Sequence, residues 1–214
     1  IDQMKNSVKT NGKNCILVLE SGKCLYGNGV GYNGNFLGEL CFNTSVTGYQ
    51  EILTDPSYFN QIINFTFPHI GIVGANSEDC ESDRIFASGC IVNNKIRESS
   101  NYRSEINFDE WLKKNKKVCI SGIDTRVLTK EIRNSGVTNV MIHFPLNCKF
   151  DDVKNLQRQL KTFPIMKNLD LASKVSTKNI YKWSQSKKQN ITKSFKNKKF
   201  IAVLDFGIKR NILN

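Results

Sequence analysis

The chain has 214 residues, 39% of them hydrophobic, which is enough for one domain with a buried core and the beginning of another. No apolar run approaches the ~20 residues of a membrane-spanning helix, and residues 1–5 lack the apolar core of a signal peptide, so we expect no membrane association. The formal net charge of +12 comes from lysines spread along the whole chain, without the regularly interleaved aromatic residues of a nucleic-acid-binding surface, so we expect no nucleic-acid partner.

A polar tail, residues 1–14, precedes the first predicted strands. The chain does not begin with Met, and we expect it to be a piece of a longer protein. Cys15–Glu20 has the apolar content of a strand, Ser21-Gly22 is typical of a tight turn, and Lys23–Tyr26 follows as a second strand. These residues predict a β-hairpin.

Glycines recur at positions 27, 29, 31 and 34, which is too dense for a helix. The spacing superficially resembles a phosphate-binding loop, but no helix pattern follows it, and the Lys-Ser/Thr ending of a P-loop is missing. Bulges and turns between strands are the better interpretation.

The middle of the chain alternates short strands with turns and one long loop. Gln61–Phe67 alternates apolar and polar residues, as a strand does, whereas residues 69–84 are rich in Gly, Asn, Ser, Asp and Glu and predict an extended surface loop. The other predicted elements here are strands at Leu37–Phe42 and Phe86–Ile96 and a short helical turn at Tyr49–Leu53, halted by Asp55-Pro56.

From residue 105 onward the periodicity becomes helical. Asp124 is placed to cap a helix over Thr125–Asn134, and Gly136 is placed to end it. The inward face of this helix is expected to carry Val127, Leu128 and Ile132. Further helices are predicted around Phe108–Leu112 and over Asp151–Leu160, with strands at Val118–Ser121 and Thr138–Phe144. The pattern predicts an α/β fold, a β-rich β/β/α-type domain over residues 15–165 with two or three helices.

A polar and increasingly basic stretch, residues 166–199, has the composition of a linker. The pattern then restarts, because Phe200–Leu204 is continuously apolar, like a strand buried on both faces of a parallel sheet, and Gly207–Leu213 predicts a turn entering a helix. Such a strand needs neighbours to bury its faces and pair its edges. Residues 200–214 therefore predict the truncated start of a doubly wound α/β domain.

The cysteines and histidines do not form a metal-binding pattern. The seven cysteines contain no C-x-x-C pair, and only His69 and His143 are present to assist. The thiols are interpreted as small buried groups in a reducing compartment, so we expect a cytoplasmic protein without a metal site. Both histidines are interpreted as structural. The cysteines are Cys15, Cys24, Cys41, Cys80, Cys90, Cys119 and Cys148.

Two segments are distinctive. Gly38–Tyr58, which continues through Gln61–Ile63 to Pro68–Gly71, closely resembles the amino-terminal domain of the carbamoyl phosphate synthetase small subunit. Asp205–Leu213 resembles the opening of the class I glutamine amidotransferase domain of the same family. Further similar segments keep the family's order and lie at Glu81-Ser82, Ser100–Arg103, Ser121–Thr129 and Asp170–Ser176.

The resemblance implies a subunit that removes ammonia from glutamine and passes it to a large subunit. That partner uses bicarbonate and ATP to make carbamoyl phosphate for pyrimidine and arginine synthesis. Glutamine hydrolysis in the family uses a cysteine thiolate activated by a His–Glu pair, downstream of the Asp205–Leu213 segment. We therefore expect no catalytic residue and no cofactor in this chain, with ATP and Mg²⁺ on the large subunit only.

One site residue carries over from the resemblance. Ser57 corresponds to a family serine that contacts bound L-glutamine, and a hydroxyl on a loop stiffened by Pro56 suits that role. Taken from the residues alone, Ser57 is a turn serine that caps a backbone group. The alternative hypothesis for the whole chain is a stand-alone basic domain that binds protein or RNA.

Overall fold

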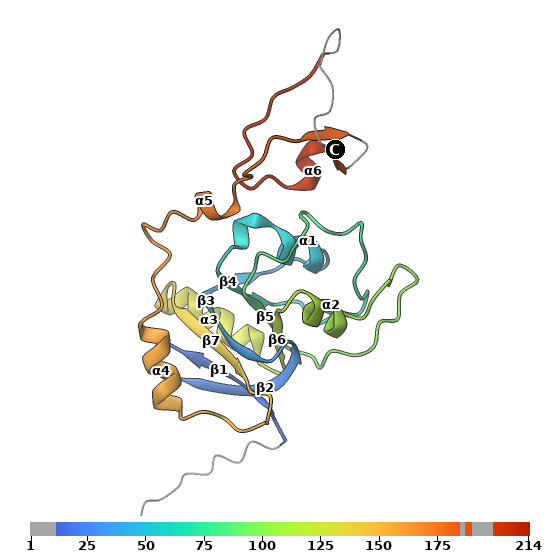
Figure 1. Ribbon diagram of the computed structural model, residues 1–214. Coiled ribbons are helices and arrows are strands. Elements are labelled where there is room, and N and C mark those ends of the chain that lie inside the picture. Colours follow the sequence, from blue (N-terminus) through green and yellow to red (C-terminus); the bar gives the residue numbers. More distant parts are fainter. Residues whose placement is uncertain (1–11, 185–186, 190–198) are drawn as a thin grey trace, which may run out of the picture.

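The computed structural model describes residues 12–184, 187–189 and 199–214 (Figure 1). The predicted tail at 1–14 lies outside this range except for its last three residues, and so do residues 185–186 and 190–198 of the predicted linker. The described strands are β1 (Cys15–Leu19), β2 (Cys24–Gly31), β3 (Gly34–Asn43), β4 (Gln61–Phe65), β5 (Gly89–Val92), β6 (Val118–Ser121), β7 (Asn139–Phe144), β8 (Lys182–Ser184) and β9 (Lys187–Gln189). The helices are α1 (Tyr49–Thr54), the 3-10 turn η1 (Pro56–Tyr58), α2 (Phe108–Lys114), α3 (Thr125–Ser135), α4 (Val153–Lys161), α5 (Ala172–Val175) and α6 (Arg210–Leu213).

Within the described residues, seven strands close into a barrel in the order β1–β2–β6–β5–β4–β3–β7. β1 and β2 pair antiparallel across the expected turn, where the Leu19 N–H donates to the Lys23 carbonyl at 2.9 Å. β3, β4, β5 and β6 run parallel, whereas β7 pairs antiparallel with both β1 and β3. The hairpin prediction is confirmed, while the closure of the strands into a mixed barrel was not predicted.

Alternate strand residues face the barrel interior, as the two-residue period of a strand requires. In β1, Leu17 and Leu19 pack inside, whereas Ile16 and Val18 belong to an outer cluster. Helix α3 contributes Leu128 to the interior cluster. The core of the domain therefore lies inside the barrel and includes one face of α3.

Helices cover the outside of the barrel. α1 and α2 pack on β4, β5 and β6 through Leu53, Phe108 and Leu112, and α4 packs on β1 and β7 through Leu156 and Leu160 (Figure 1). This arrangement confirms a β-rich α/β domain with few helices.

The prediction of turns between strands is right only at the end of the glycine-rich stretch, where Tyr32-Asn33 connects β2 to β3, and it is wrong for the first three glycines. Gly27, Gly29 and Gly31 lie inside β2. A Cβ at Gly27 would lie 2.5 Å from the Ser121 carbonyl oxygen, and one at Gly29 would lie 2.5 Å from the ring of Phe144. A side chain would not fit at either position, because the backbone of the neighbouring β6 approaches Gly27 and the ring of Phe144, at the end of β7, approaches Gly29.

The predicted boundaries of α3 are confirmed to within a residue, but its predicted inward face is partly wrong. Asp124 accepts the Val127 N–H at 2.9 Å as N-cap, and the helix ends before Gly136. Leu128 and Ile132 are buried, whereas Val127 is 52% exposed. Residues four positions apart share a helix face, and Val127 lies beside the face that Leu128 and Ile132 define.

Two predicted strands differ from the structure. The strand expected at Phe86–Ile96 is limited to β5, because the ladders with β4 and β6 involve only Gly89–Val92. The segment Phe200–Leu204 forms no strand, and Ile201 is 91% and Leu204 83% exposed. A strand forms only beside a partner, and no ladder among the described residues includes Ile201–Leu204.

Among the described residues, none of the helices combines the length and the apolar composition that crossing a bilayer would require.

Candidate functional site

Ser57 lies on a short turn that directly follows α1. It is the middle residue of η1, and the carboxylate of the N-cap residue Asp55 accepts the Ser57 N–H at 2.9 Å. Pro56 fixes the backbone at the start of the turn, and the Tyr58 hydroxyl accepts an amide hydrogen from Asn43 at 3.0 Å. Ser57 itself is exposed. The backbone is therefore held on both sides of a serine that remains accessible to solvent.

The C-terminal segment, residues 199–214, packs against this turn. Lys209 Nζ lies 2.7 Å from Asp55 Oδ2, so one carboxylate joins the Ser57 turn through Oδ1 and the C-terminal segment through Oδ2. A Cβ at Gly207, whose φ is +101°, would lie 3.0 Å from the Cβ of Pro56. Figure 1 shows α6 standing on the side of the barrel that carries α1. Two parts of the chain that are far apart in sequence thus meet beside Ser57.

A second capped turn, around Asp205, sets the direction of the C-terminal segment. Asp205 Oδ1 accepts the N–H groups of Gly207 at 2.9 Å and of Ile208 at 2.8 Å, and Oδ2 accepts the hydroxyl of Tyr181 at 2.6 Å. Burial and the hydrogen bond to Asp205 raise the pKa of Tyr181 to about 12, so the phenol remains a donor at neutral pH. These bonds fix the backbone that carries Lys209 toward Asp55.

The electrostatics of the turn favour binding rather than nucleophilic attack. The hydrogen bond to Asp55 raises the pKa of Lys209, which therefore stays charged at neutral pH beside a carboxylate whose side chain is only 8% exposed. Neither histidine is hydrogen-bonded to Ser57 in the described part of the chain, so there is no Ser–His pair there of the kind that activates a serine nucleophile. An exposed hydroxyl can instead donate to, or accept from, the polar ends of a small ligand.

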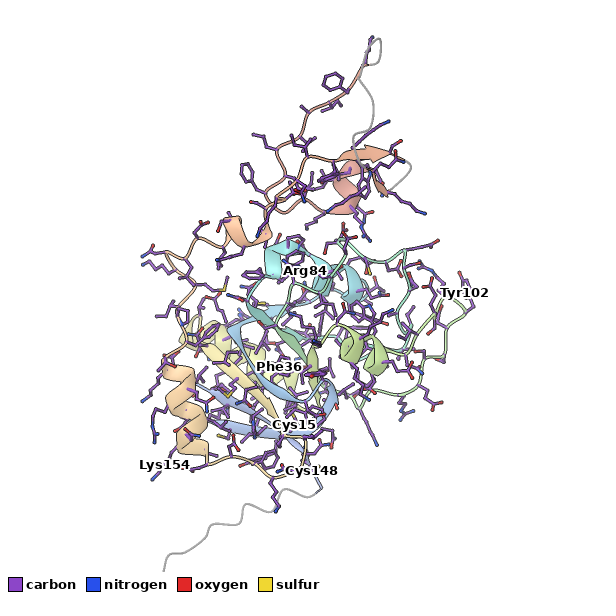
Figure 2. All side chains as sticks on the ribbon, viewed as in Figure 1. Cys15, Phe36, Arg84, Tyr102, Cys148 and Lys154 are labelled. Atoms are coloured by element: carbon purple, nitrogen blue, oxygen red, sulfur yellow. The ribbon has the colours of Figure 1, made fainter. Side chains whose placement is uncertain are left out.

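Five of the seven cysteines have the character of structural thiols. Burial raises the pKa of each, whereas a cysteine nucleophile requires a lowered value. These five are Cys15, Cys24, Cys41, Cys80 and Cys119. Cys15 and the exposed Cys148 lie at the end of the molecule away from the C-terminal segment (Figure 2). The described residues contain no group of three or more His, Cys, Asp or Glu that could hold a metal ion.

The two histidines occupy different environments. His69 is exposed and stacks edge-on against Phe67, with ring centroids 5.4 Å apart. His143 is buried in β7, where Nδ1 lies 2.5 Å from the Asn35 side-chain oxygen and Nε2 accepts the Asp151 N–H at 3.3 Å. His143 therefore links β3 to the start of the segment that leads into α4.

The position of His143 makes stability depend on pH. Burial lowers its pKa below the ordinary value of 6.5, although nearby Asp151 opposes the shift. The folded state therefore binds fewer protons than the unfolded state, and its stability is fully present above pH 6.5 and falls as the pH drops through the lowered folded-state value. We expect a His143→Gln variant to lose less unfolding free energy than the wild type between about pH 7.5 and about pH 5 in urea titrations.

The control is His69→Gln, because His69 is exposed. This variant should keep the pH dependence of the wild type. If the unfolding free energy of His143→Gln falls with decreasing pH as steeply as that of the wild type, His143 does not cause the pH dependence.

Several residues around Ser57 were not predicted from the sequence. Asp55 was predicted only to halt a helix. Glu81 and Lys209 were noted only as members of segments that resemble the family, and neither was given a role or a partner. Glu81 accepts two hydrogen bonds from Asn211. The available signal was that Asp55 and the acidic loop at 78–83 complement the consecutive Lys209-Arg210, but sequence distance gave no reason to pair them.

Comparison with known proteins places the chain in a family. Residues 17–142 match the model of the carbamoyl-phosphate synthase small chain, CPSase domain. The chain is 46% identical over 208 residues to the carbamoyl phosphate synthase small chain of Buchnera aphidicola subsp. Schizaphis graminum. The aligned residues cover 94% of this chain and 53% of that protein. It is 42% identical over 201 residues to the small chain of Zymomonas mobilis, covering 92% and 54%, and 44% identical over 216 residues to that of Bartonella henselae, covering 95% and 53%.

The chain therefore spans about half the length of the curated relatives it matches. The order of the matching segments, the extent of the family match and the identity to these relatives agree with one another, and they do not favour a stand-alone interaction domain. We conclude that the chain belongs to the family of carbamoyl phosphate synthase small chains.

Proposed function

We propose that this chain is the front part of a glutamine-hydrolysing carbamoyl phosphate synthase small chain, in which Ser57 contacts the bound glutamine. The observation that carries the proposal is the placement of Ser57, exposed on a braced turn beside the segment that resembles the start of the glutamine amidotransferase domain. A hydroxyl in this position can bind the charged ends of an amino acid without taking part in bond cleavage.

The domain organisation belongs to the same proposal. Residues 15–165 form the small-subunit amino-terminal domain, residues 166–199 a linker, and residues 200–214 the opening of the glutaminase domain. The exposure of the apolar Ile201 and Leu204 supports this division, because a strand of this composition is normally buried by neighbouring strands and helices of its own domain. The glutaminase cysteine, histidine and glutamate then lie in the remainder of the small chain.

The partner in this proposal is the carbamoyl phosphate synthase large subunit, and the complex works in the cytoplasm. The large subunit binds ATP and Mg²⁺, and this chain holds no cofactor. The ammonia released from glutamine is used there for carbamoyl phosphate synthesis, which feeds pyrimidine and arginine synthesis.

Ser57→Ala in the full-length small chain, assembled with its large subunit, tests the glutamine contact. Losing one hydrogen bond to a charged group removes roughly 1.5–3 kcal/mol of binding, so the KM for glutamine should rise about ten- to hundredfold. Synthesis driven by added ammonia should stay unchanged, because ammonia bypasses the glutamine site. Steady-state kinetics with each nitrogen donor measure both quantities.

Ser100→Ala is the matched control, since Ser100 is an exposed serine on the loop between β5 and α2. It should leave both activities unchanged. Equal losses of glutamine- and ammonia-dependent activity in Ser57→Ala would mean that Ser57 is structural, and an unchanged KM for glutamine would refute the contact.

A further inference from the structure

The C-terminal segment and the barrel domain are joined by consecutive residues that each meet a separate carboxylate. Lys209 pairs with Asp55, Arg210 pairs with Asp83, and Asn211 is bound by Glu81. Figure 2 places Arg84, the residue after Asp83, at the end of the barrel domain that faces the C-terminal segment. Three consecutive residues of the C-terminal segment thus each bind a different acidic residue of the barrel domain. We call this one-to-one pairing the register of the contact.

Glu81 makes the most selective of these contacts. Its Oε1 accepts the side-chain amide of Asn211 at 2.8 Å, its Oε2 accepts the Asn211 backbone N–H at 3.1 Å, and its carbonyl accepts the Arg210 N–H at 3.0 Å. Glu81 is only 7% exposed, whereas the Asp83 side chain is 64% exposed. Hydrogen bonds to a buried carboxylate are stronger and more directional than an exposed ion pair, so Glu81 decides the register.

Glu81 is also tied directly to the helix that precedes Ser57. Its N–H donates to the Thr54 hydroxyl at 2.8 Å, and the Ser82 hydroxyl donates to the Thr54 carbonyl at 2.6 Å. Thr54 is the last residue of α1 and is followed by Asp55, Pro56 and Ser57. Hydrogen bonds from Asn211 to Glu81 and from Glu81 to Thr54, followed by the three peptide bonds from Thr54 to Ser57, therefore connect Asn211 to Ser57.

We propose that Glu81 is a positioning residue for the Ser57 site, which holds Asn211 and thereby fixes where the chain beyond the Asp205 turn stands relative to Ser57. This inference rests on the proposed function, because it assumes that the chain beyond Asn211 supplies the rest of the glutamine site. Glu81 acts through Asn211 and touches no substrate.

A suppressor experiment in the full-length small chain, assembled with its large subunit, tests the pairing. Asn211→Asp places a carboxylate opposite that of Glu81, and we expect the KM for glutamine to rise about tenfold while the ammonia-dependent rate changes less than about twofold. Glu81→Gln alone should have a small effect, because the Asn211 amide can turn over to accept from the new amide. In the double variant the side-chain amide introduced at position 81 donates a hydrogen bond to the carboxylate introduced at position 211. The KM for the substrate glutamine should then return to within about threefold of the wild type.

Asp83→Asn is the matched control, since it removes a charge from the same loop without touching Asn211. It should not rescue Asn211→Asp. Rescue by Asp83→Asn equal to that by Glu81→Gln, or an unchanged KM in Asn211→Asp, would overturn the inference. If Asn211→Asp gives no folded complex, Glu81→Ala against Asp83→Ala provides the same comparison, with a raised KM for glutamine expected only for Glu81→Ala and an unchanged KM there overturning the inference.

The Ser57→Ala variant separates the two proposals. A raised KM in Ser57→Ala with an unchanged KM in Asn211→Asp refutes only the positioning role. An unchanged KM in Ser57→Ala refutes the glutamine contact itself.

Discussion

Gly31→Ala is expected to lower the free energy of unfolding by about 2–5 kcal/mol, the sum of about 1–2 kcal/mol of backbone strain and about 1–3 kcal/mol of steric overlap. Gly31 has a φ of +93°, where a side chain is disfavoured. A Cβ there would overlap the Lys117 carbonyl oxygen and would lie 2.8 Å from the Leu112 Cβ. Neither atom can move without disturbing β6 or α2. Equilibrium unfolding in urea measures the loss.

Gly48→Ala is the control for strain without overlap. Gly48 has a φ of +82°, but its new Cβ would meet nothing closer than a Glu51 carboxylate oxygen at 3.5 Å. This variant should lose only about 1–2 kcal/mol. Equal losses for the two variants would show that the close approach of β2 to its neighbours does not constrain the barrel.

Leu128→Ala should destabilise the protein by about 2–5 kcal/mol, because it removes a buried side chain and leaves a cavity. Leu128 is 1% exposed and belongs to the cluster that fills the barrel. The loss should appear as a lower urea midpoint with an unchanged denaturant dependence.

Val127→Ala, one residue away on the same helix, provides the comparison. Val127 is 52% exposed, so this variant should stay within about 0.5 kcal/mol of the wild type. The sequence pattern alone placed both residues on the inward face of α3. A large loss for Val127→Ala would support that pattern and contradict the packing of α3 described above.

Part of the positive charge is used within the chain. Lys209 pairs with Asp55, and Arg210 and Lys188 both pair with Asp83, with Lys188 Nζ 3.7 Å from its carboxylate. These basic residues therefore pair with two acids on either side of Ser57 in the sequence. Asp55 precedes Ser57, and Asp83 lies in the loop that follows β4. The compositional argument against nucleic-acid binding did not include this role, because the pairs are distant in sequence.

The candidate site was only partly predictable from the sequence. The Asp-Pro-Ser-Tyr turn follows local rules, because Asp55 caps the turn and Pro56 starts it, and the resemblance singled out Ser57. The contacts of Asp55 with Lys209 and of Glu81 with Asn211 were not predicted. No local propensity encodes a hydrogen bond between residues 130 positions apart.

Elements with local causes could be predicted from the amino-acid sequence, such as the first hairpin with its Ser21-Gly22 turn and α3 between Asp124 and Gly136. Caps and turns act within a few residues, so their signals can be read directly from neighbouring residues. Three other features depend on long-range packing: glycines lie inside β2, Val127 faces outward, and Ile201–Leu204 forms no strand. Each of these outcomes depends on which distant backbone or side chain comes close, and that is settled when the barrel closes and its neighbours pack.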